Sequence, residues 1–446
     1  MGSGIMTETL TDSWLVGLLC LVLGFLLLQL YKLVWGASSR AYKLPPGSTG
    51  WPLIGETISF FRGINSTAQP RQFIQERERR YGEIFRSNLF GRSRIVVSVD
   101  PEFNKHVLQH EGRQFQANYP KPLRNLIGKY GLLSVHGDLQ RKLHGAAVNL
   151  LRFERLSVDF MEDIQNLLHI TLAKWEAKRD IHLQEECHQL VLNLMAKQLL
   201  DLSPSKDTEE ICEAFGHFSE ALLAVPIKIP GTKYARGFKA REFLIKKIYE
   251  SIEDRRQHPE AVHNDLLTKL LKEDSFSEEI IADFILFLLF AGHETSSRSM
   301  SFAIKFLTDC PRALRVGNFG PGVFRETKED IKTKGGFVIP RGWTVYVFLT
   351  GTHLDEKYHS SALKFDPWRW QPHLQDQELL KNPSFMPFGG GARLCPGMHL
   401  AKMELALFLH NFVTKFRWEA LQDDKISYFP FPRLIKGLPI RLRLRE

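Results

Sequence analysis

Cysteine is scarce in this sequence, with five residues in a chain of 446. They are widely spaced, their number is odd, and no two of them form a CxxC pair. This usage excludes a scaffold of disulfide bonds and indicates a reducing compartment. It also excludes a zinc site, because three or four clustered ligands are absent. The five are Cys20, Cys187, Cys212, Cys310 and Cys395.

Runs of one charge, internal repeats and low-complexity segments are also missing. Lysine and arginine outnumber aspartate and glutamate by 59 to 50, which gives a formal net charge of +9, but they are dispersed along the chain. Without a basic tail we expect no nucleic-acid partner. A basic surface favours anionic lipid or an acidic protein; the alternative is that these charges only solvate the surface.

Charge is absent from Trp14 to Tyr31, where the sequence reads WLVGLLCLVLGFLLLQLY. As a helix this span would measure about 27 Å, close to the hydrocarbon core of a bilayer at roughly 30 Å. Lys32 follows the span, which places the N-terminus in the lumen and the rest of the chain in the cytosol. We therefore predict a membrane anchor over residues 1–36 and a proline-rich linker over residues 37–52.

A cleaved signal peptide is the alternative for this span. Such a peptide begins with basic residues and has a shorter apolar stretch. Here Glu8 and Asp12 precede the span, and no lysine or arginine does. The pattern favours an uncleaved anchor.

The remaining sequence predicts a body that is mainly α-helical with small β-sheets (α+β). Two β-rich runs, 84–90 and 94–99, predict a hairpin. Helical patterns dominate between residues 101 and 310, and a second β-rich zone lies between residues 337 and 349. With 43% apolar residues the chain can build a large core, and we assign residues 53–446 to one domain.

One helix carries polar residues directly after an apolar stretch. It runs from Ser275 to Leu307 and is apolar almost all round from Ile280 to Ala291, so we expect it to cross the centre of the protein. Glu294 and Thr295 follow within AGHETS. A buried carboxylate is costly unless it is paired or functional. The alternative is an ordinary helix that emerges into water at His293.

The stretch FGGGARLCPG, residues 388–397, surrounds one cysteine with glycines. Pro396 suits the first position of a helix, and a helix N-terminus favours a thiolate at Cys395. The glycines let the backbone approach a flat partner, and Arg393 could meet an anion. Together these features describe haem with a cysteine ligand. The alternatives are a small buried cysteine and a nucleophile, whose histidine base the sequence cannot place.

Phe388, Gly391, Arg393, Cys395 and Gly397 together resemble the haem-binding signature of the cytochrome P-450 family. AGHETS resembles the oxygen-activating helix motif of that family, and FDPWRW, residues 365–370, resembles the segment before its haem loop. Finer features, such as GWPLIGETISFF and PIKIPGT, are similar to the plant steroid-hydroxylating branch, which includes brassinosteroid hydroxylases. The resemblance extends over nearly the whole chain after the anchor.

The resemblance implies a cytochrome P-450 fold and a haem-thiolate monooxygenase that hydroxylates a steroid or triterpenoid with O2. Cys395 would be the axial ligand of the iron, while Glu294 and Thr295 would deliver protons. Arg393 and Arg325 would pair with the haem propionates. The implied partners are an NADPH–cytochrome reductase, a lipid bilayer and an apolar steroid or triterpenoid. The implied location is the endoplasmic reticulum membrane, single-pass, with a cytosolic catalytic domain. The haem-binding loop would be completed by Phe388, Gly389, Gly391 and Gly397.

One family motif is missing from the sequence. The family carries Glu-x-x-Arg on a helix between the two motifs, and this pair binds the arginine of the segment before the haem loop, here Arg369. Arg312 and Arg315 stand at the expected place, and the two motifs are only 100 residues apart, from 295 to 395. We interpret this as an internal deletion near residues 312–316. The alternative function is an inactive, membrane-anchored isoform that cannot hold haem.

We predict that residues 14–31 remain in the mature protein, because acidic residues precede the span and basic residues follow it. N-terminal sequencing of the membrane-bound protein checks this. A mature chain that begins near Ser38 would show that the span is a cleaved signal peptide.

Overall fold

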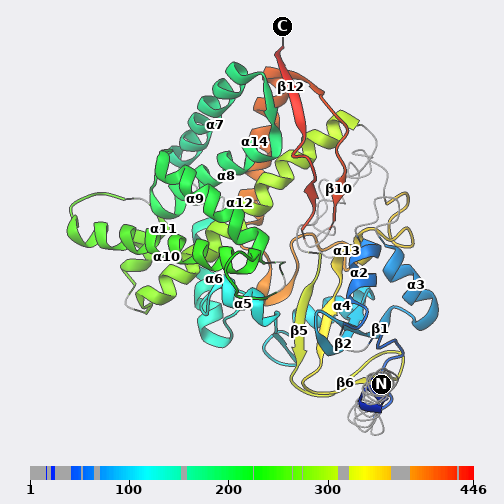
Figure 1. Ribbon diagram of the computed structural model, residues 1–446. Helices are drawn as coiled ribbons and strands as arrows, with labels where there is room; N and C mark the ends of the chain where they lie inside the picture. The colour runs from blue at the N-terminus through cyan, green and yellow to red at the C-terminus, as the bar shows by residue number, and fades with distance from the viewer. Residues whose placement is uncertain are drawn as a thin grey trace, which may run out of the picture.

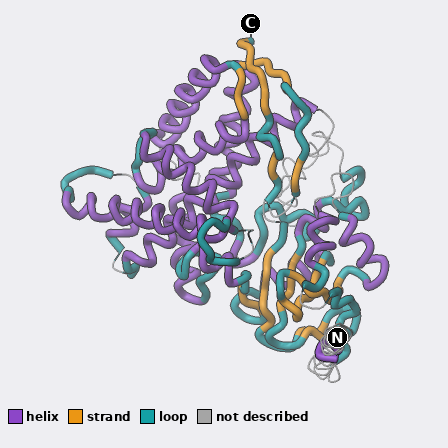
Figure 2. Tube along the Cα trace, in the orientation of Figure 1, coloured by secondary structure: helices purple, strands orange, loops and turns teal. Residues whose placement is uncertain are grey.

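The computed structural model describes Gly17 and Ala224 and residues 22–25, 42–51, 54–64, 71–151, 158–222, 226–263, 265–273, 275–309, 321–362, 382–428 and 431–445. A large helical part lies beside a smaller part that holds the main sheet, as Figures 1 and 2 show. The predicted fold class, mainly α-helical with small β-sheets, is confirmed.

The helices α2, α3 and α4 lie beside the main sheet, and most of the later helices belong to the helical part. They are α2 (Thr57–Ile64), α3 (Gln72–Tyr81), α4 (Pro101–Gln109), α5 (Lys121–Ile127), α6 (Gly137–Leu151), α7 (Val158–Lys178), α8 (Leu183–Leu200), α9 (Lys206–Ala221), α10 (Lys233–Gln257), α11 (Leu266–Leu271), α12 (Glu278–Asp309), α13 (Leu349–His353) and α14 (Met398–Lys415), with a 3₁₀ turn, η5 (Gly391–Arg393).

The main sheet joins segments from distant parts of the sequence, in the order β1-β2-β8-β5-β3. Its strands are β1 (Ile84–Leu89), β2 (Arg92–Ser98), β3 (Phe115–Ala117), β5 (Val323–Thr327) and β8 (Thr344–Val347). β1 and β2 form the predicted antiparallel hairpin, and β2 then pairs in parallel with β8, from the second predicted β-rich zone. β5 pairs with β3 and places Arg325 opposite Ala117.

Three smaller sheets complete the described β-structure. A three-stranded sheet holds β4 (Asp180–His182), β12 (Pro439–Leu444) and β9 (Phe416–Ala420) in that order. The remaining strands form two pairs, β6 (Ile331–Lys332) with β7 (Val338–Ile339) and β10 (Ile426–Ser427) with β11 (Arg433–Leu434). The three-stranded sheet ties the C-terminal strand to the helical part.

Helix α12 is the centre of the helical part, as its apolar sequence predicts. It packs against α8, α10, α11 and α14. Glu278–Thr308 is long and apolar enough to cross a membrane, yet 78% of its most apolar window is buried inside the protein. His293 and Glu294 are 2% and 3% exposed, so the alternative of a helix that emerges into water at His293 is wrong.

The predicted anchor and the missing motif fall mostly outside the described residues. Of the span 14–31, only Gly17 and residues 22–25 are described, and these are helical and exposed. Arg312, Arg315 and Arg369 lie outside the described residues. The described part of the linker, residues 42–51, runs beside β1. The carbonyls of Pro45 and Pro46 accept hydrogen bonds there from Arg86 at 2.6 and 2.8 Å.

Two helix glycines offer a matched test of close packing between α9 and α10. A Cβ added at Gly237 of α10 would lie 2.0 Å from the Cβ of Ala221, whereas one at the exposed Gly216 of α9 would meet no atom within 4 Å. We predict that Gly237→Ala lowers the free energy of unfolding by about 1–3 kcal/mol through overpacking. Gly216→Ala should raise it by up to about 1 kcal/mol through helix propensity. Urea unfolding followed by circular dichroism measures both, and equal effects would contradict the packing of α9 on α10.

Candidate active site

Cys395 lies in a turn between η5 and α14. Its backbone N–H donates to the Phe388 carbonyl at 3.0 Å, and Gly397 is the N-cap of α14. Burial raises the pKa of the Cys395 thiol, although a hydrogen bond from the Gly397 N–H lowers it. Our expectation that the helix start alone favours a thiolate is wrong, because loss of water outweighs this single N–H. A thiolate here requires a positive partner.

The glycines before Cys395 serve two different needs. Gly391 has φ +66°, and a Cβ there would lie 2.0 Å from the Leu108 carbonyl oxygen of α4. Gly389 has φ +73°, and a Cβ there would meet no atom within 4 Å. Gly391 is therefore required where the turn packs against α4, whereas the space beside Gly389 is open.

Arg393 and Arg325 are 68 positions apart in the sequence (393 minus 325). Both form an ion pair with the carboxylate of Glu111. Glu111 Oε2 is 2.6 Å from Arg325 Nε, and Glu111 Oε1 is 2.8 Å from Arg393 Nε. All three side chains are at most 10% exposed. Sequence reasoning missed Glu111, which follows α4 in a turn and belongs to no pattern. Its negative charge binds the guanidinium groups of Arg325 and Arg393 beside the Cys395 turn.

Further hydrogen bonds hold the turn from the helical side. Arg393 donates to the carbonyls of Leu132 and Val135 at 2.6 and 2.7 Å. Gln140 and His144 of α6 bind the carbonyls of Ala392 and Leu394 at 3.1 and 2.8 Å. Gln140 and His144 thus contact the backbone of the turn that carries the cysteine.

Glu294 is buried in α12 and is neutralised by a neighbour one turn away. Its Oε1 forms an ion pair with Arg298, which also donates to the Pro432 carbonyl at 3.1 Å. The hydroxyl of Ser219 in α9 donates to Oε2 at 3.3 Å. Burial raises the pKa of Glu294, although Arg298 and Ser219 lower it. The carboxyl group is therefore held closer to its protonated form than an exposed glutamate.

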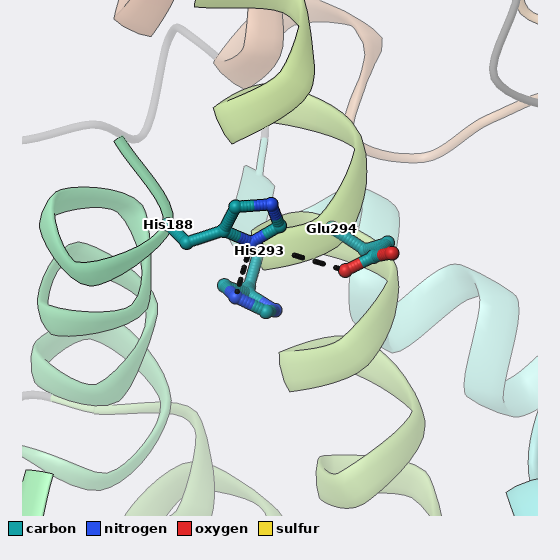
Figure 3. Close-up of side chains that lie close together, drawn as sticks. All are labelled: His188, His293 and Glu294. Carbon is teal, nitrogen blue, oxygen red and sulfur yellow. Dashed lines mark hydrogen bonds and ion pairs between the residues drawn. The ribbon is translucent and has the colours of Figure 1, made fainter. Parts of the chain in front are cut away.

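Two histidines lie against Glu294, as Figure 3 shows. His188 Nδ1 of α8 is 3.0 Å from His293 Nε2 and 3.9 Å from Glu294 Oε2. Burial lowers the pKa of His188 to about 3 and that of His293 well below its usual value, so both rings are neutral. These three residues offer metal-ligating atoms within 4.8 Å of one another. The hydrogen bond between the two rings and the ion pair of Glu294 with Arg298 already explain why these side chains lie together, so a metal ion is not needed to hold them.

Thr295 lies on a different face of α12. Its hydroxyl donates to the Ala291 carbonyl at 2.7 Å. Ala291, Thr295 and Ser299 recur every four residues and are half-buried, within a helix that is otherwise largely buried. A Cβ at the neighbouring Gly292 would lie 2.5 Å from Met195 Cε, so Met195 of α8 covers that side of the helix. The open face is therefore the one that carries Thr295.

The residues present fit a haem group. A half-buried cysteine thiol, room beside Gly389 and two buried arginines are the donor set that a thiolate-ligated haem requires. The half-buried face of α12 adds small residues, which a flat ligand can approach.

Comparison with known proteins decides the family. The cytochrome P450 family model matches residues 45–314 and 312–439. The chain belongs to the cytochrome P450 family. It is therefore a member of a family of haem monooxygenases, and haem is its cofactor.

Relatives of this P450 include two pine proteins. Cytochrome P450 720B2 of Pinus taeda is 91% identical over 487 aligned positions, which cover 100% of each chain. Abietadienol/abietadienal oxidase of Pinus taeda is 62% identical over 90% of this chain and 91% of its own. Steroid (22S)-hydroxylase of Oryza sativa subsp. japonica is 34% identical over 91% and 89%.

A solved structure shares the fold. Retinoic acid bound cyanobacterial CYP120A1 superposes with a TM-score of 0.78 and 25% sequence identity, over 91% of this chain and 100% of its own.

Glu404 is a buried carboxyl group behind the site that sequence reasoning also missed. It lies on α14, is 1% exposed, and neither oxygen has a hydrogen-bond partner of good geometry among the described residues. Burial raises its pKa to about 7, although the facing Ser296 hydroxyl of α12 lowers it. A carboxylate inside the apolar run of α14 was the available signal. The group couples the helix of the cysteine turn to the helix of Glu294.

Glu404 predicts a pH-dependent stability. Because its folded pKa lies above its unfolded value of 4.5, the folded chain holds a proton that the unfolded chain releases, and stability falls as pH rises from about 4.5 to 7. Glu404→Gln should abolish this slope and gain up to about 3 kcal/mol relative to the parent above pH 7. Thermal unfolding at pH 5 and pH 8 measures it. A parent chain and a variant with the same pH slope would refute the buried titration.

Proposed function

We propose that this P450 oxidises a diterpenoid alcohol or aldehyde at one carbon. The observation that carries the proposal is 62% identity with abietadienol/abietadienal oxidase over 90% of the chain, against 34% with the steroid hydroxylase. The sequence features led us to expect a steroid or triterpenoid as substrate. The relatives named for a steroid substrate are the more distant ones, at 34% identity. Oxidation of the alcohol to the aldehyde, and of the aldehyde to the acid, consumes one O2 and two electrons at each step.

Cys395 is proposed as the residue that would bind the haem iron, which would supply the oxygen-activating chemistry when bound. Its position in a glycine turn before α14 and the family signature around it support this role. Arg325 and Arg393 are proposed to hold the propionates, because they are buried cations beside the turn. Phe388, Gly389, Gly391 and Gly397 shape the turn.

Glu294 and Thr295 are proposed to move protons during the reaction. Burial raises the pKa of Glu294, and Arg298 and Ser219 fix the orientation of its carboxyl group. Thr295 carries its hydroxyl on the half-buried face of α12. Electrons would come from an NADPH–cytochrome reductase, with the chain anchored in the endoplasmic reticulum membrane by residues 14–31.

We propose further that the chain lacks about 41 residues at one internal position. Its alignment with Cytochrome P450 720B2 has 487 positions, 41 more than the 446 residues of this chain, and an identity of 91% means that nearly every residue present is matched. The two stretches that match the family model meet at residues 312–314. There Arg312 stands where a family member carries the glutamate that pairs with Arg369.

The absent segment would lower the activity of the chain. Breaking a buried ion pair costs about 3–5 kcal/mol, a large share of a typical unfolding free energy of about 5–15 kcal/mol. The second candidate function follows from this: an anchored protein that does not oxidise substrate.

Restoring the segment tests both candidates. We predict that the chain with the 41 residues of Cytochrome P450 720B2 inserted after Leu314 converts abietadienol at least about tenfold faster than the chain as it stands, because an arginine would again have its acidic partner. Product formation from abietadienol and from a sterol is measured with a reductase, at equal protein concentration. Arg312→Glu without the insert is the control and should rescue little. Equal turnover by both chains would contradict the deletion, and turnover of the sterol alone would contradict the substrate.

A further inference from the structure

A cavity of about 1130 Å³ opens between α5, α10 and the first turns of α12. None of its lining residues belongs to the Cys395 turn. Its volume slightly exceeds the usual range of small-molecule sites, about 300–1,000 Å³, so a ligand with a fused ring system fits. Asp283 of α12 lies at its wall and binds the Tyr130 N–H at 3.1 Å.

Three polar atoms of residues that line this cavity have no hydrogen-bond partner among the described residues. They are Arg124 Nε, Ser134 Oγ and Arg241 Nε, and each atom is buried. All three can donate a hydrogen bond. An unsatisfied buried polar group costs about 1–3 kcal/mol, so a ligand that accepts hydrogen bonds from these atoms would remove a cost that the chain otherwise carries.

The charge of the lining selects an anion. Five cationic side chains line the cavity against two carboxylates, Glu279 and Asp283. Asp283 is already paired with Arg241, whose Nε remains without a partner. Lys121, Lys129 and Lys228 add exposed positive charge at the opening. A positive cavity favours an anionic ligand group.

Several of the remaining lining residues are apolar, beside the polar groups of Asn125, Tyr234 and Tyr249. Pro122 belongs to α5, Phe238 and Ile245 to α10, and Ala282 to α12. Lys228 Nζ lies 4.3 Å from the ring centre of Phe238, so its charge packs on this aromatic face. A ligand of this cavity therefore has an apolar body and one anionic group.

Resting on the proposed function, we propose that this cavity binds the carboxylate of the diterpenoid acid that oxidation of the aldehyde produces. Such an acid is ionised at neutral pH, because an exposed carboxyl titrates near pH 4. Its two oxygens would accept hydrogen bonds from Arg124, Ser134 and Arg241, and its rings would contact the apolar wall. The alcohol substrate lacks this charge, so the cavity distinguishes product from substrate.

Binding to the full chain tests this with abietadienoic acid and abietadienol, which share their rings and differ in the carboxylate. Isothermal titration should give an affinity for the acid at least about tenfold above that for the alcohol. Arg124→Gln should weaken binding of the acid about tenfold and leave the alcohol unchanged. Ser134→Ala should weaken the acid while it leaves thermal stability equal or higher, since it removes an unpaired hydroxyl. The matched control is Arg417→Gln on β9.

Equal affinities for acid and alcohol, or acid binding that neither variant changes, would overturn the site. So would an Arg124→Gln variant that weakens haem binding while Ser134→Ala leaves the acid unaffected, because Arg124 would then belong to the haem. Failure of the proposed function looks different: the acid binds and responds to the variants, but no abietadienol is oxidised by the restored chain.

Discussion

The carboxylate of Glu111 joins the sheet to the turn that carries Cys395. It binds Arg325 of β5 on one oxygen and Arg393 of the turn on the other, with all three groups nearly excluded from water. Removing one partner of a buried ion pair costs about 3–5 kcal/mol, so this arrangement is expensive to disturb. The position of the cysteine relative to β5 depends on it, and Gln140 and His144 add the connection to α6.

A second group of buried charges stabilises α12 at its polar interruption. Glu294 and Arg298 are one turn apart and neutralise each other, and the two neutral histidines fill the space toward α8. The pair leaves Thr295 on the half-buried face. Polar groups are thereby placed in a long apolar helix without an unpaired charge.

Features with a local pattern could be predicted from the sequence. The hairpin of β1 and β2, the central helix and the helix after Cys395 each have their own periodicity or turn residues. Arg298 could have been found as well, because it follows Glu294 by four positions on a helix. Glu111 could not, since its contact with Arg393 spans 282 positions and depends on the tertiary fold. The pKa of Cys395 was misjudged for a related reason: burial, which sequence does not show, outweighs the helix start.

In the function proposed above, Cys395 would hold the haem iron. The absorption spectrum of the reduced, CO-treated protein tests it most directly, on the chain with its internal segment restored. We expect a thiolate-type Soret band that Cys395→Ser abolishes, while Cys187→Ser and Cys212→Ser, which change cysteines away from the turn, retain it. A thiolate-type band that survives Cys395→Ser would show that another residue binds the iron.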